Sequence, residues 1–126
     1  MRNRVHILFV FLLLAVVFSP ISAAETKAVQ TMSGILLKLN HFPNDAEKKT
    51  LQGIVEDKTT TAQERVVAQA LINVQHKATA EDKTKLEAVV KDTTAPESVK
   101  TLATIVLGLN HAPSDADKEK LKKLAS

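Results

Sequence analysis

The sequence predicts an all-α fold, in which three tandem 35-residue helical hairpins form a short α-solenoid-like array of six helices after a cleaved signal peptide. Three observations favour this fold. The 126-residue chain opens with an apolar segment typical of export signals, and the histidines that follow it, His41, His76 and His111, recur every 35 residues. Apolar residues recur at three- and four-residue steps, and no stretch alternates with period two.

The first 24 residues have the pattern of a signal peptide. Two arginines precede an apolar run from Ile7 to Phe18, which is too short to cross a hydrocarbon core of ~30 Å as a helix. Ser22 and Ala24 put small residues at the two positions that a signal peptidase inspects, which predicts cleavage before Glu25. We therefore expect a periplasmic or secreted protein; retention of the segment as an anchor stays open as an alternative.

The remaining chain, residues 25–126, is predicted to be a single helical repeat domain. It contains no cysteine, which excludes disulfides and thiolate metal sites, and Phe42 is its one aromatic residue of the Phe, Tyr and Trp class. Its 15 lysines and arginines against 14 aspartates and glutamates leave a net charge of +1, so the composition argues against nucleic-acid binding.

An internal repeat organises this domain. The 21 residues from Ile35 match those from Ile105 at 10 positions, and the middle copy, which starts at Ala70, is more diverged. The units lie at approximately 25–60, 61–93 and 94–126. In period and helix count the repeat resembles tetratricopeptide and pentatricopeptide arrays, but the Trp and Tyr of the tetratricopeptide pattern are missing, and we assign the chain to neither family.

Each unit is predicted to contain two helices. In the first unit, apolar positions from Val29 to Leu39 form one buried face, and Pro43 ends the helix near His41. The predicted helices lie near 26–41, 45–57, 62–76, 80–92, 95–111 and 115–125. Five capping pairs mark helix starts: Asn44 with Glu47, Thr61 with Glu64, Thr79 with Asp82, Thr94 with Glu97, and Ser114 with Asp117.

The recurring histidines are the sharpest candidate site. We interpret His41, His76 and His111 as structural residues that close the carboxyl ends of the first helices. The alternative is a metal site, because imidazole and a carboxylate six residues later suit zinc or copper. Since stacked hairpins lie about 8–10 Å apart, we expect the three histidines to form a spaced ladder that does not converge on one ion.

The expected function is that of a non-enzymatic binding or scaffolding module without a cofactor. No nucleophile and base occur in a catalytic pattern. The stretches 35–39 and 105–109 are aliphatic on almost all sides, which predicts an uncovered face for a protein partner or for self-association. The lysines that recur on every second helix, such as Lys48 and Lys83, indicate a solvated face or a weak electropositive stripe for an acidic partner. The alternative function is binding of a metal or small ligand by the repeated histidines.

Overall fold

The computed structural model describes residues 25–126, and the predicted signal peptide lies outside them. The described part contains six helices and no strand, which confirms the predicted all-α fold. The helices are α1 (Lys27–Lys38), α2 (Asp45–Glu56), α3 (Ala62–Asn73), α4 (Ala80–Lys91), α5 (Glu97–Leu107) and α6 (Asp115–Ala125). Within these residues, no helix combines the length and the apolarity needed to cross a membrane.

The first helix of each unit ends earlier than the sequence predicted. Helix α1 ends at Lys38, and Leu39 leaves the helix with an extended backbone (φ −61°, ψ 127°). Pro43 restricts only the residue directly before it, so the proline did not define the true end of the helix. The consequence matters for the site, because His41 lies in a turn beyond the helix.

Helix starts carry four of the five predicted capping residues. The Asn44 side chain accepts a hydrogen bond from the Glu47 N–H, and the Glu47 carboxylate accepts one from the Asn44 N–H in return. Thr61 and Glu64 make the same reciprocal pair. The remaining two caps each accept one backbone hydrogen bond, Thr79 from Asp82 and Ser114 from Asp117. These local bonds fix where the helices begin.

The fifth predicted pair, Thr94 with Glu97, is corrected by the structure. Helix α5 starts at Glu97 with Pro96 in the N-cap position, and no side chain caps it. Thr94 instead donates both its N–H and its hydroxyl to Oδ1 of Asp92, at 2.9 and 2.6 Å. A carboxylate two residues before a threonine closes an Asx turn, which is the more local of the two alternatives.

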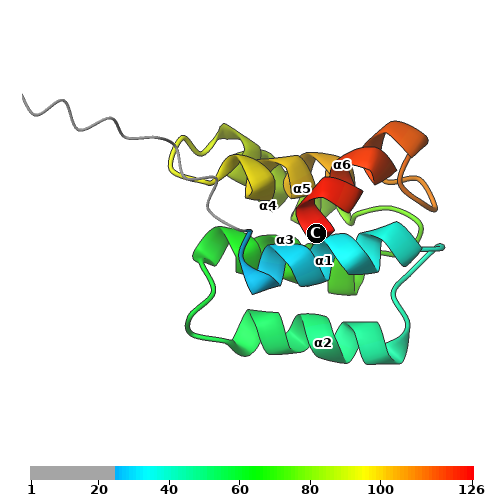
Figure 1. Ribbon diagram of the computed structural model, residues 1–126, viewed down its shortest axis with the longest axis horizontal. Coiled ribbons are helices and arrows are strands. Elements are labelled where there is room, and N and C mark those ends of the chain that lie inside the picture. The colour runs from blue at the N-terminus through cyan, green and yellow to red at the C-terminus, as the bar shows by residue number, and fades with distance from the viewer. Residues whose placement is uncertain (1–24) are drawn as a thin grey trace, which may run out of the picture.

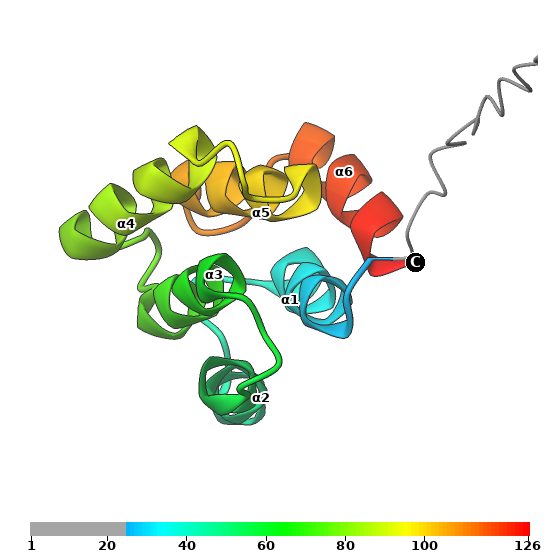
Figure 2. The same cartoon turned by 90° about the vertical axis from the view of Figure 1, so that its left-hand side faces the viewer.

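The six helices close into a ring. Helices α1, α3 and α5 contact one another at the centre, and α2, α4 and α6 lie on the outside (Figure 2). Each outer helix packs most extensively against an inner helix of the next unit: α2 against α3, α4 against α5, and α6 against α1. Because the last helix packs against the first, the three tandem units surround a common axis instead of following one another along a line.

Closure of the ring also determines where the hydrophobic core lies. The inner helices supply most of the fully buried side chains, including Met32 and Leu36 on α1, Leu71 on α3 and Leu102 on α5. The aliphatic stretches 35–39 and 105–109 lie in this core, with Ile35, Leu39, Ile105 and Leu109 all buried. The expected uncovered face at these stretches is therefore not found, because contacts between α1 and α6 and among the inner helices cover it.

Candidate metal centre

Three turns of the same shape carry the histidines. We call them the histidine turns: they follow the inner helices α1, α3 and α5 and lie together at one end of the molecule (Figure 1, right). In each turn the residues on either side of the histidine pair as an isolated bridge, and in the first repeat the Phe42 N–H donates to the Asn40 carbonyl at 3.0 Å. In this first turn the hydrogen bond is that of a γ-turn, which reverses the chain at a single residue. In the second turn the Gln75 N–H donates to the Lys77 carbonyl at 3.2 Å.

The backbone of each histidine adopts a left-handed conformation. The φ angles are 71°, 65° and 68° for His41, His76 and His111, and these are the non-glycine residues with positive φ in the described chain. Such a conformation costs about 1–3 kcal/mol per residue and persists where surrounding structure enforces it. The strain therefore falls on one residue of each repeat, and in every repeat that residue is histidine.

The backbone groups of the three histidines hold one another in a closed ring of hydrogen bonds. The His76 N–H donates to the His41 carbonyl at 2.8 Å, and the His111 N–H donates to the His76 carbonyl at 2.8 Å. The His41 N–H closes the ring on the His111 carbonyl at 2.7 Å. Each turn is thus positioned by the other two repeats, which supplies the enforcement that the strained backbone needs.

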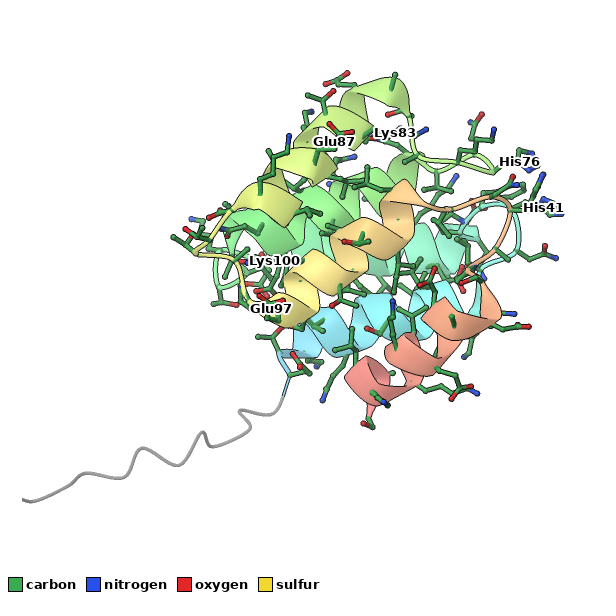
Figure 3. The ribbon with its side chains drawn as sticks, turned by 90° about the horizontal axis from the view of Figure 1, so that it is seen from above. His41, His76, Lys83, Glu87, Glu97 and Lys100 are labelled. Atoms are coloured by element: carbon green, nitrogen blue, oxygen red, sulfur yellow. The ribbon has the colours of Figure 1, made fainter. Side chains whose placement is uncertain are left out.

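The side chains converge on one point. The Nδ1 atoms lie 3.0 Å apart for His41 and His76, 3.0 Å for His41 and His111, and 2.9 Å for His76 and His111. The rings meet edge to face, with centroids 4.7–5.0 Å apart, and Figure 3 shows His41 and His76 side by side. The expectation of a spaced ladder is wrong, because the repeats close around an axis and residues next to that axis meet. We call this group the histidine centre.

Hydrogen bonding among the three rings does not satisfy this arrangement. A hydrogen bond between two Nδ1 atoms needs one atom that carries a proton and one that presents a lone pair. Among three atoms, at least two are in the same state, so at least one pair at about 3 Å has either two protons or two lone pairs face to face. A cation bound by three lone pairs removes the conflict for all three atoms at once.

The dimensions of the histidine centre fit a metal ion. With metal–nitrogen bonds of ~2.0–2.1 Å, nitrogens 2.9–3.0 Å apart subtend about 90° at the ion, whereas a tetrahedral angle needs a separation of about 3.3–3.4 Å. Three ligands at right angles form one face of an octahedron. His76 and His111 are exposed and His41 is half-buried, so the histidine centre lies at the surface of the molecule.

The acidic residues that follow the histidines do not join the site. The Glu47 carboxylate accepts from the backbone of Asn44, and the buried Asp82 carboxylate accepts from Asn73 and Thr79 at 2.9 and 2.8 Å. Asp117 lies 3.7 Å from Lys120. In the described residues the group with ligand atoms close enough for one ion consists of the three histidines. Of the carboxylates expected beside the histidines, those of Glu47 and Asp82 bond at helix starts, and that of Asp117 lies beside a lysine.

Comparisons with protein-family models, with curated proteins and with solved structures gave no match for this chain. The class of the protein is therefore defined by its own fold and geometry. It is an all-α protein of three repeats, closed around an axis, with one histidine from each repeat at the end of that axis.

Proposed function

We propose that the protein binds one divalent transition-metal ion through the Nδ1 atoms of His41, His76 and His111. The observation that carries this proposal is the convergence of three Nδ1 atoms to within 2.9–3.0 Å of one another. The strained backbone at each histidine and the unsatisfied triangle of ring nitrogens support it independently, because both have a cost that a bound cation offsets.

The chemistry of the donors narrows the choice of metal. Three imidazoles and no carboxylate favour zinc, copper, nickel or iron over magnesium or calcium, which prefer oxygen ligands. Neutral imidazoles leave the full charge of the ion in place, and the histidine centre lies at the surface, where solvent or another ligand can complete the coordination of the ion. The site is therefore an exposed metal centre with room for a further ligand, in contrast to a closed structural site.

Calorimetric titration of the full-length chain with Ni²⁺, Co²⁺ and Zn²⁺ tests the proposal. We expect one ion per chain in the wild type and no specific binding after simultaneous replacement of His41, His76 and His111 by alanine. The matched control is His6→Ala, which removes the fourth histidine of the sequence, outside the described residues. Unchanged stoichiometry in the triple variant, or loss of binding in the His6 variant, contradicts the proposal.

The scaffolding role expected from the sequence stays a prediction with less support than the metal site. The protein partner or self-association expected with it was argued from an uncovered aliphatic face, and Ile35, Leu39, Ile105 and Leu109 of the stretches concerned are buried. Export also stays a prediction. Mass spectrometry of the exported protein tests it, with a mature chain starting at Glu25 as the expected result.

A further inference from the structure

A cleft opens beside the histidine centre, on the side of His76. Its inner part encloses about 230 Å³ and is lined by Phe42, Lys48, Gln75 and His76. Three of these residues also line a larger hollow of about 570 Å³, which extends along the turn between α3 and α4 to Lys77. Because they share these walls, the two hollows form one cleft, and His76 of the histidine centre lines it.

The charge of this cleft is positive and unbalanced. Among the residues that the structure describes, no carboxylate lines either hollow. Within residues 25–126, neither Lys48 nor Lys77 has a carboxylate oxygen within 4.0 Å, whereas Lys118, the counterpart of Lys48 in the third repeat, lies 3.9 Å from Asp115. Lys48 is half-buried, with its Nζ 5.9 Å from the centre of the Phe42 ring, a contact that holds the ammonium group beside the first histidine turn.

The three sides of the histidine centre are not equivalent. The residue directly after each histidine is Phe42 in the first repeat, Lys77 in the second and Ala112 in the third. The aromatic side chain and the additional lysine thus flank the cleft between the first and second repeats. The repeat supplies one histidine from each unit. Phe42 and Lys77, which differ from the equivalent residues of the other repeats, make the side of the centre that faces the cleft different from the other two sides.

We propose that this cleft binds a small oxyanion, a carboxylate or phosphate group, which occupies an open coordination position of the ion held by the histidine centre. The inference rests on the proposed metal site. Three neutral imidazoles leave the ion its full positive charge, and oxygen anions are ligands for such ions. The ammonium groups of Lys48 and Lys77 add a second attraction for the same anion.

Visible spectroscopy of the Co²⁺-loaded full-length chain tests this inference, because the d–d bands of cobalt respond to a change of ligand. Phosphate and acetate are titrated separately, and we expect a saturable spectral change with at least one of them. Lys48→Gln should weaken the apparent anion affinity about tenfold, as for the loss of one charge-assisted contact. A stronger response to phosphate assigns a phosphate-bearing ligand, and a stronger response to acetate assigns a carboxylate.

The control is Lys118→Gln, which removes a lysine at the equivalent position of another repeat and should keep the wild-type anion affinity. If Co²⁺ does not bind to the wild type, the proposed function itself fails. If Co²⁺ binds but the spectrum ignores both anions, or if Lys48→Gln and Lys118→Gln behave alike, the metal site stands and the anion site is wrong.

Discussion

The two ends of the helical ring carry turns of opposite character. At one end lie the histidine turns, and at the other lie the turns after α2 and α4, which begin at Asp57 and Asp92 (Figure 1, right and left). In each of these aspartate turns Oδ1 of the aspartate is bonded within the turn: Oδ1 of Asp57 accepts from the Thr59 N–H and hydroxyl at 2.8 and 2.7 Å, with an ordinary φ of −72°. Asp92 accepts from Thr94 in the same way, and its Oδ2 also accepts from Gln63 on α3 at 2.9 Å.

The histidine turns depend on one another instead. Their backbone is left-handed, and their hydrogen bonds run to other repeats. A turn that needs distant partners to hold a strained conformation is unfavourable as a mere connection, and the aspartate turns show that this chain has a relaxed alternative. The contrast therefore favours the end with the strained histidine turns as the place where a ligand binds.

The largest effect that we expect is a loss of metal affinity, and only substitutions at the histidine end should cause it. His76→Ala removes one of three ligands and should weaken metal binding by more than about 100-fold, since losing even a hydrogen-bond partner of a ligand costs 10–100-fold. Asp92→Ala at the other end should leave the affinity unchanged. Calorimetry measures both variants, and equal losses would remove the distinction between the ends.

The helices could be predicted from the sequence because their signals are local. Apolar spacing from Val29 to Leu39 and the capping pair of Asn44 with Glu47 act within a few residues, so reading along the chain finds them. The error at Thr94 is also local, because the sequence does not decide whether its hydroxyl caps α5 or bonds to Asp92.

The histidine centre could not be predicted in the same way. A repeat of 35 residues is compatible both with a line of hairpins, which separates equivalent residues, and with a ring, which brings those near the axis together. The contact between α1 and α6 decides between them, and it joins the two ends of the domain. The signal for a ring in the sequence was the pair of aliphatic stretches 35–39 and 105–109, because a ring buries them.

Metal binding should also stabilise the fold through the histidine end. An ion present at 100 times its dissociation constant should raise the free energy of unfolding by about 2.7 kcal/mol, if the unfolded chain does not bind it. Thermal unfolding followed by circular dichroism should show the increase in the wild type and in Asp92→Ala. The same increase in His76→Ala would mean that the stabilising ion binds at a site other than the histidine centre.

A smaller effect tests the strain directly, in metal-free protein. Glycine adopts positive φ without cost, so His76→Gly should be about 1 kcal/mol more stable than His76→Ala. At Asp57, where φ is −72°, the order should reverse, because glycine gains only freedom in the unfolded state. Urea unfolding of the four variants measures both differences, and a His76→Gly variant no more stable than His76→Ala would show that the histidine turns are not strained.

The smallest effect that we expect is a change of the free energy of unfolding with pH, and it arises at the aspartate end. Hydrogen bonds from the Thr94 hydroxyl, from Gln63 and from the Thr94 N–H favour the charged carboxylate of Asp92, which lowers its pKa from 3.8 to about 2. Because the folded pKa is the lower one, this stabilisation is fully present above the unfolded pKa of ~3.9 and is lost as the pH falls through about 2.

Asp92→Asn keeps the shape of the side chain and removes its titration. The stability difference between the wild type and Asp92→Asn should therefore be constant above about pH 5 and shrink between about pH 4 and pH 2. Urea midpoints measured across this range, without metal, give the comparison. A difference that does not change with pH would mean that the hydrogen bonds from Thr94 and Gln63 do not favour the charged carboxylate of Asp92.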